Sequence, residues 1–220
     1  MFATDAEQAR FNMVEQQIRP VEVINERVIE AFRSVPREHF VDPSQRSLAF
    51  ADTHLPLGSS EVMMTPIQEG LMLQALDVQP GDRVLEIGTG SGYVTACLAH
   101  LGGKVDSYEI DPQLSARAAD RLQSLGVHGV HLRVADIFSI GLPQGGFDVI
   151  AVTGSLPLEN EQFTRALAPG GRLFAILGED PIMKATLITR SIQGNIKREA
   201  LSETRLPPLK NAPQPERFVF

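Results

Sequence analysis

The chain has 220 residues, 43% of them hydrophobic, and a formal net charge of −7. This composition indicates one compact α/β domain, and the absence of a Lys/Arg run argues against a non-specific nucleic-acid binder, which needs a basic face. We find no secretory signal, and the longest uncharged stretch, 87–103, is too rich in glycine to span a membrane. The single cysteine, Cys97, excludes an internal disulfide and a multi-cysteine zinc site. We therefore expect a cytoplasmic protein with neither a nucleic-acid nor a membrane partner.

Three helices are predicted before the glycine-rich centre of the sequence. Apolar residues at helical spacing predict the first two over about residues 5–18 and 21–35, and Pro36 ends the second one. The stretch 55–64 reads as a loop. It leads into a third helix, for which Thr65 suits the N-cap, Pro66 the first position and Gln68 a capping box.

Strand and helix patterns alternate from residue 79 to residue 178, which predicts βαβ units and a mostly parallel sheet. The last segment differs, because stretches 185–192 and 196–204 flank Gly194-Asn195 and predict an antiparallel hairpin. The end of the chain, 207–220, is proline-rich and closes with Arg217–Phe220 (RFVF), a candidate edge strand. We expect one domain, 1–220, made of a helical cap and loop (1–78), a cofactor-binding core (79–178) and a hairpin with a tail (179–220).

A glycine turn, Gly88-Thr89-Gly90-Ser91-Gly92, joins a predicted strand at 84–87 to a predicted helix at 93–101. Glycine permits a positive φ and leaves no Cβ to block a ligand. The turn opens onto a helix N-terminus, whose free N–H groups attract anionic or electron-rich ligand atoms. A purely structural turn is the alternative. The candidate cofactor-binding residues of this turn are Gly88, Thr89, Gly90 and Gly92.

The spacing of the glycines in the turn distinguishes between two candidate cofactors. The dinucleotide fingerprint is G-x-G-x-x-G, and its third glycine brings the helix close to the strand. Tyr93 occupies that position here and is too bulky for this role. Glu86, two residues before the first glycine, can face a cationic amino group, which a pyrophosphate lacks. Both differences favour S-adenosylmethionine over NAD.

Two further carboxylates follow predicted core strands. Glu109 ends the second one, at the carboxyl edge where open α/β sheets bind ligands. It can accept hydrogen bonds from both ribose hydroxyls, each worth roughly 1.5–3 kcal/mol. Asp136 follows the third strand, where an adenine amino group would lie, and a turn cap is its alternative role. The histidines are scattered, so we predict neither a metal site nor a catalytic triad.

Several separated motifs occur in one order along the chain: Met13–Ile18 (MVEQQI), Val35–Val41 (VPREHFV), Asp52 with Leu55–Gly58 (LPLG), Val84–Tyr93 (VLEIGTGSGY) and Thr153. Together they resemble the protein-L-isoaspartate O-methyltransferase family over about Met13 to Gly178. The resemblance implies a doubly wound, mostly parallel, seven-stranded methyltransferase (Rossmann-like) sheet. It also implies that S-adenosylmethionine methylates an isoaspartyl carboxylate of a damaged protein or peptide, giving S-adenosylhomocysteine and beginning protein repair.

The predicted loop departs from the family pattern, which is roughly G-x-G-Q-T-I-S-x-P. Met64 stands at the family's Ser or Thr position, Glu61 replaces Gln, and Ser60 replaces the second Gly. Methionine cannot donate a hydrogen bond, and Glu61 in the pocket would repel a substrate carboxylate. The remaining candidate donors are Ser59, Ser60 and Thr65, although we expect the Thr65 hydroxyl to cap a helix. The altered loop leaves the methyl acceptor open.

Three functions are compatible with these patterns. The first is an S-adenosylmethionine-dependent O-methyltransferase of this family, acting on isoaspartyl carboxylates or on another acceptor. The second is a cofactor-binding but catalytically inactive adaptor or sensor, which Met64 and the divergent tail, 207–220, support. The third is a nicotinamide enzyme, which Tyr93 and Glu86 disfavour.

Overall fold

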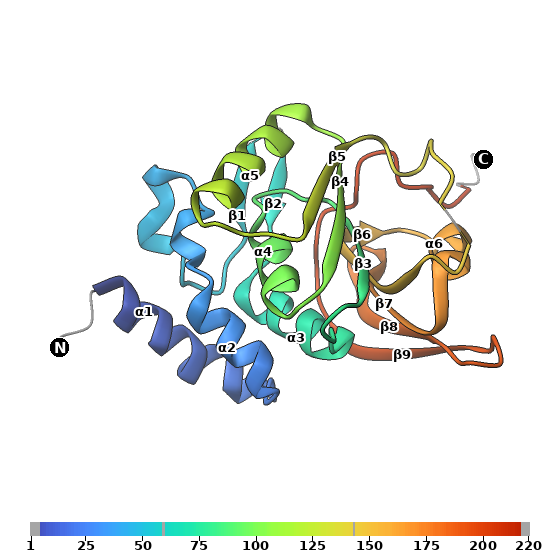
Figure 1. Ribbon diagram of the computed structural model, residues 1–220, viewed down its shortest axis with the longest axis horizontal. Coiled ribbons are helices and arrows are strands. Elements are labelled where there is room, and N and C mark those ends of the chain that lie inside the picture. Colours follow the sequence, from blue (N-terminus) through green and yellow to red (C-terminus); the bar gives the residue numbers. More distant parts are fainter. Residues whose placement is uncertain (1–4, 59, 143, 217–220) are drawn as a thin grey trace.

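The computed structural model describes residues 5–58, 60–142 and 144–216, and a seven-stranded sheet with the order β5-β4-β3-β6-β7-β8-β9 forms its centre (Figure 1). The strands of this sheet are β3 (Arg83–Ile87), β4 (Lys104–Glu109), β5 (Val130–Val134), β6 (Phe147–Leu156), β7 (Leu167–Glu179), β8 (Ile182–Arg190) and β9 (Ile196–Glu203). A separate two-stranded sheet consists of β1 (Leu55–Gly58) and β2 (Glu61–Met63). The α-helices are α1 (Asp5–Met13), α2 (Glu26–Ser34), α3 (Pro66–Leu76), α4 (Tyr93–His100), α5 (Pro112–Ser124) and α6 (Glu161–Ala166).

The order of the strands fixes where a ligand can bind. Strands β5, β4, β3, β6 and β7 pair in parallel, whereas β8 pairs with β7 and β9 in antiparallel fashion. This confirms the predicted mostly parallel, seven-stranded sheet with a C-terminal hairpin. From β3 the chain proceeds outward through β4 and β5 and then returns to the other side of β3 as β6. The carboxyl ends of β3, β4 and β6 therefore surround the switch point at which such sheets bind ligands.

Helices cover both faces of the sheet. On β3, Val84 belongs to one buried cluster and the next residue, Leu85, to the other, as the alternation of side chains along a strand requires. The first cluster includes Phe32 of α2 and Cys97 of α4, and the second includes Phe163 of α6. Burial on both faces explains the buried, mostly apolar runs of the central strands β3 and β6. Cys97 is a buried core residue.

The N-terminal helices differ from the prediction in where they begin and end. Helix α1 continues into a π-helical turn, Val14–Ile18, so the first predicted helix is confirmed with a change in its last turns. The second was predicted from residue 21 but begins at Glu26, because the Asn25 side chain caps it by accepting a hydrogen bond from the Arg27 N–H. No helix in the described part of the chain combines the length and the apolar character needed to cross a membrane.

The stretch that was predicted as a loop is a short hairpin. Leu55 pairs with Met63 and Gly58 with Glu61, so β1 and β2 form two antiparallel strands that we call the acceptor hairpin. Helix α3 follows it, with the predicted capping box between Thr65 and Gln68. The prediction of a loop was wrong because three-residue β2 carries too little alternation to stand out in the sequence. The division of the chain at residues 78 and 178 stays a prediction.

Candidate functional site

The glycine turn lies between β3 and α4 and has the backbone that its sequence predicts. Gly88, Gly90 and Gly92 have φ values of +95°, +53° and +87°. A Cβ on Gly88 would lie 2.5 Å from the Thr153 hydroxyl oxygen, which itself lies 2.9 Å from the Ile87 carbonyl oxygen. The end of β6 therefore packs directly against the turn, and only glycine fits at position 88.

Tyr93 explains why the turn differs from a dinucleotide fingerprint. Its side chain is fully buried, and its ring centroid lies 5.6 Å from that of Phe40. The Arg37 guanidinium lies 5.1 Å from the same ring centroid. Tyr93, at the third position of the fingerprint, thus packs the start of α4 against the N-terminal part of the chain.

Glu86 lies beneath the turn and does not line the pocket there, which corrects the direct ligand contact that we inferred from its position. The side chain is fully buried, and one carboxylate oxygen accepts hydrogen bonds from the hydroxyls of Thr95 (2.5 Å) and Ser107 (2.6 Å). Burial raises the pKa of the Glu86 carboxyl to about 8, and these two hydrogen bonds oppose the rise. Through these two hydrogen bonds Glu86 connects β3 to α4 and β4 beneath the turn. Alternation along the strand points its side chain away from the pocket.

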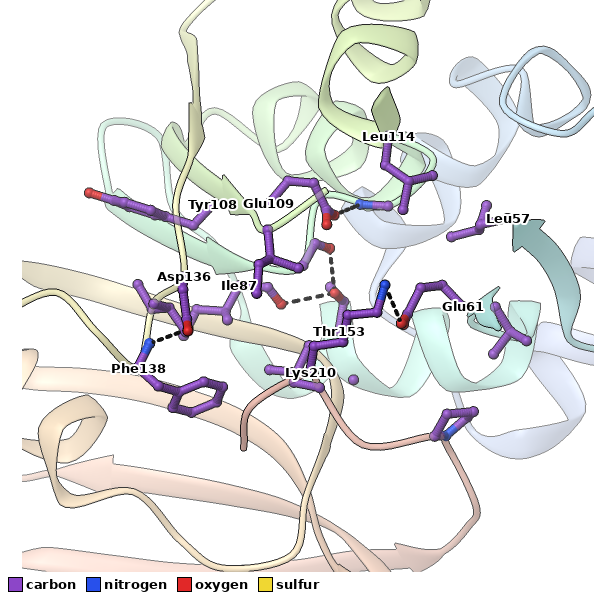
Figure 2. Close-up of a pocket in the computed structure, with 18 of the residues that line it drawn as sticks. Leu57, Glu61, Ile87, Tyr108, Glu109, Leu114, Asp136, Phe138, Thr153 and Lys210 are labelled. Atoms are coloured by element: carbon purple, nitrogen blue, oxygen red, sulfur yellow. Dashed lines mark hydrogen bonds and ion pairs between the residues drawn. The ribbon is translucent and has the colours of Figure 1, made fainter. Parts of the chain in front are cut away.

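A pocket that is open to solvent lies at the carboxyl ends of β3, β4 and β6 (Figure 2). Glu109 lines it, and its two oxygens accept hydrogen bonds from the backbone N–H groups of Gly90 (2.9 Å) and Asp111 (3.0 Å). These bonds aim the carboxylate from the end of β4 toward the glycine turn. Each carboxylate oxygen keeps a second lone pair for a ligand.

Asp136 lines the same pocket at its other end, two residues after β5. One carboxylate oxygen accepts from the Phe138 N–H (2.9 Å) and the other from the Asn211 side-chain amide (2.8 Å). Both of its predicted alternatives thus have support: it forms a local turn contact, and it faces the pocket. Ile137 and Phe138 add apolar walls beside it.

The acceptor hairpin forms the opposite wall of the pocket. Leu57, Glu61 and Val62 line it, and a Cβ on Gly90 would lie 3.0 Å from Leu57 Cδ1. The hairpin and the glycine turn are therefore in contact. A narrower space lies between them and is lined by Met64.

Of the predicted donors of this region, Ser60 and Thr65 do not line the pocket. Ser60 is exposed in the hairpin turn with φ +67°, a left-handed conformation that explains why a glycine is usual there. The Thr65 hydroxyl accepts the Gln68 N–H (3.3 Å) and caps α3, as expected. Ser59 lies outside the described residues.

The C-terminal tail supplies the wall that sequence reasoning missed. Leu206, Pro207, Leu209 and Lys210 line the pocket, although they lie far along the chain from the glycine turn. The Lys210 ammonium nitrogen lies 3.2 Å from a Glu61 carboxylate oxygen, and Figure 2 shows the two side chains meeting across the pocket. Only the loose match of the tail to the family's ending marked this segment in the sequence. Among the described residues, no cluster of histidine, cysteine or acidic side chains is arranged to hold a metal ion.

Comparison with known proteins identifies the family. The sequence model that describes the protein-L-isoaspartate(D-aspartate) O-methyltransferase family matches residues 8–214 of this chain. A protein-L-isoaspartate O-methyltransferase of Aeropyrum pernix is 38% identical over 206 residues, which cover 92% of this chain and 79% of that protein. One of Gloeobacter violaceus is 36% identical over 204 residues, covering 92% and 99% of the two chains.

A solved structure shows the same fold. The protein-L-isoaspartate O-methyltransferase of Plasmodium falciparum, crystallised with S-adenosyl-L-homocysteine, superposes with a TM-score of 0.78 at 20% identity, covering 94% of this chain and 99% of that one. These matches confirm the family resemblance of the motifs and the class of enzyme, an O-methyltransferase. The chain belongs to the protein-L-isoaspartate(D-aspartate) O-methyltransferase family.

Proposed function

We propose that this chain transfers a methyl group from S-adenosylmethionine to an isoaspartyl carboxylate of a damaged protein or peptide. The observation that carries the proposal is the contact between the acceptor hairpin and the glycine turn, which line one pocket through Leu57 and Gly90. A donor and an acceptor bound on these two elements would meet. S-adenosylhomocysteine, the product expected here, is bound in the Plasmodium protein.

The residues around the pocket fit this cofactor. Gly88, Thr89, Gly90 and Gly92 would hold its methionine part through their backbone, and the close packing of Thr153 against Gly88 keeps the turn in shape. Glu109 and Asp136 line the pocket. Glu109 would accept hydrogen bonds from the ribose hydroxyls, and Asp136 would accept one from the adenine amino group. Glu86 lies beneath the turn and stabilises it through its hydrogen bonds with Thr95 and Ser107. When bound, the cofactor supplies an electrophilic methyl group on a sulfonium.

Methylation of a carboxylate needs little from the acceptor side beyond alignment. The acceptor pKa is near 4, so its lone pair is available at neutral pH without a general base. Orientation of the two reactants can recover about 7–11 kcal/mol of the barrier. The hairpin residues Leu57 and Val62 and the tail residue Leu209 are apolar and line the pocket, so they would exclude water around the reacting atoms.

A cofactor-binding adaptor or sensor is the second candidate function. The observation in its favour is Met64, which lines the space between hairpin and turn where the family has a hydroxyl. Such a protein would bind the cofactor tightly and transfer no methyl group. The cytoplasmic location stays a prediction.

Two measurements separate these functions. Calorimetric titration with S-adenosylmethionine, S-adenosylhomocysteine and NAD should give binding of the first two alone, and NAD binding would instead favour a nicotinamide enzyme. Incubation with labelled methyl donor and an isoaspartyl peptide should then label the peptide. The variant Met64→Ser is the matched comparison. Activity that Met64→Ser has and the wild type lacks would reject isoaspartyl methylation by the native protein.

A further inference from the structure

The pocket has an unusual charge balance for an enzyme with an anionic acceptor. Its described lining includes three carboxylates, Glu61, Glu109 and Asp136, and one cationic side chain, Lys210. An acceptor carboxylate that enters such a pocket meets repulsion unless the acidic groups are compensated. On the acceptor hairpin, a cation beside Glu61 would reduce this repulsion.

Each of the three carboxylates has partners. Two backbone N–H groups bind Glu109, and the Phe138 N–H and the Asn211 amide bind Asp136. Glu61, on the acceptor hairpin, pairs with the ammonium of Lys210 at 3.2 Å. This pair removes the repulsion that Glu61 alone would exert. It also leaves two of the three N–H bonds of the ammonium for other acceptors.

The tail holds Lys210 in place. On one side of it, the Leu209 N–H donates to the Ser155 carbonyl (3.0 Å), and the Ser155 N–H donates to the Pro207 carbonyl (2.9 Å). On the other side, the Asn211 amide binds Asp136. The Leu209 side chain fills the space over Gly154, where a Cβ would lie 2.6 Å from Leu209 Cδ2. The backbone at position 210 is thus fixed at the pocket mouth before any acceptor arrives.

We propose that Lys210 is the acceptor-binding residue, whose ammonium hydrogen-bonds the acceptor carboxylate and neutralises Glu61 beside it. This inference rests on the proposed function, because it assumes an anionic acceptor at the hairpin. Lys210 takes over the donor role that Met64 cannot perform. The ammonium comes from the tail, so the tail is part of the acceptor site and not only a cover for the cofactor.

The test compares the KM for an isoaspartyl peptide and the Kd for S-adenosylhomocysteine in four variants. Lys210→Met should raise KM about 10- to 100-fold, as loss of one charge-assisted hydrogen bond predicts, with kcat nearly unchanged. Lys210→Arg should keep KM near that of the wild type. Lys197→Met, at an exposed lysine on β9, is the matched control and should change nothing. The Kd for S-adenosylhomocysteine should stay constant throughout.

The fourth variant, Glu61→Gln, separates an anion-binding lysine from a simple latch between hairpin and tail. It should lower KM or leave it unchanged, because it removes a negative charge and frees the ammonium. If Glu61→Gln raises KM as much as Lys210→Met, the pair is a latch and the proposal is wrong. Raised salt should increase the wild-type KM and have less effect on Lys210→Met.

A failure of the proposed function gives a different result. If the wild type methylates no isoaspartyl peptide, binding of a labelled isoaspartyl peptide to the complex with S-adenosylhomocysteine is measured by fluorescence anisotropy. Binding that Lys210→Met abolishes would support the role of Lys210 in a protein that is not the proposed enzyme. Absence of binding, or binding independent of Lys210, would overturn the inference.

Discussion

The Arg37 guanidinium lies 3.2 Å from the Glu69 carboxylate, and neither side chain is exposed to solvent. Arg37 also donates to the Met64 carbonyl at 2.7 Å. One buried arginine thus connects the N-terminal part of the chain, the acceptor hairpin and α3. Burial raises the pKa of the Glu69 carboxyl to about 8, and the charge of Arg37 opposes the rise.

Removal of the carboxylate should destabilise the protein strongly. We expect Glu69→Leu to lower the free energy of unfolding by about 3–5 kcal/mol, because it leaves the buried arginine without its partner. Urea denaturation followed by circular dichroism measures this loss. The exposed pair of Glu161 and Arg165 is the control, and Glu161→Leu should cost less than about 1 kcal/mol. Equal losses in the two variants would contradict the role given to the buried pair.

Glu86 should make stability depend on pH. Its pKa rises from 4.5 to about 8 on folding, so the stabilisation is complete below pH 4.5 and is lost as the pH rises toward 8. The free energy of unfolding should fall by up to about 1.4 kcal/mol per pH unit for each proton taken up on folding. Urea unfolding across this range should show a smaller slope in Glu86→Gln than in the wild type. An unchanged slope would mean that Glu86 is ionised in the folded protein.

Gly88 should be essential for cofactor binding in a way that another glycine with positive φ is not. Gly81→Ala is the matched control, since Gly81 has φ +91° and nothing within 4 Å of an added Cβ. Both variants carry backbone strain of about 1–3 kcal/mol. Gly88→Ala should in addition weaken S-adenosylhomocysteine binding by about tenfold or more, because its Cβ displaces Thr153. Similar calorimetric affinities in the two variants would argue against the turn as the cofactor site.

Glu109 should contribute to affinity through the ribose. Glu109→Ala removes two charged hydrogen bonds and should weaken cofactor binding on the order of a hundredfold. The same carboxylate also binds the Gly90 N–H, so thermal unfolding of the cofactor-free variant is measured beside the calorimetric affinity. Glu199→Ala, at an exposed position on β9, provides the control. An affinity that Glu109→Ala leaves unchanged would exclude the ribose role.

The features that could be predicted from the sequence are those set by neighbouring residues. The turn from Ile87 to Tyr93 follows from the spacing of its glycines, and the start of α3 follows from the capping box of Thr65 and Gln68. Glu109 follows from its position at a strand end, since the carboxyl ends of parallel strands share one edge of the sheet. These signals are local, and the structure has them where the pattern placed them.

The features that could not be predicted depend on residues far apart in the chain. Glu86 was assigned to the ligand from its position just before the glycine turn. Its actual partners, the hydroxyls of Thr95 and Ser107, lie on other elements and show no pattern in the sequence. The pairing of Glu61 with Lys210 joins the acceptor hairpin to the tail. A sequence pattern cannot reveal which two of many charged side chains will meet in the fold.

Methyl transfer in a single turnover tests the central claim most directly. The protein, in excess over labelled S-adenosylmethionine, is mixed with an isoaspartyl peptide or with the same peptide containing ordinary aspartate, and the products are mapped by mass spectrometry. We predict a base-labile methyl ester on the isoaspartyl residue and none on the aspartyl peptide. Bound S-adenosylmethionine that transfers no methyl group to the isoaspartyl peptide would contradict the proposed function.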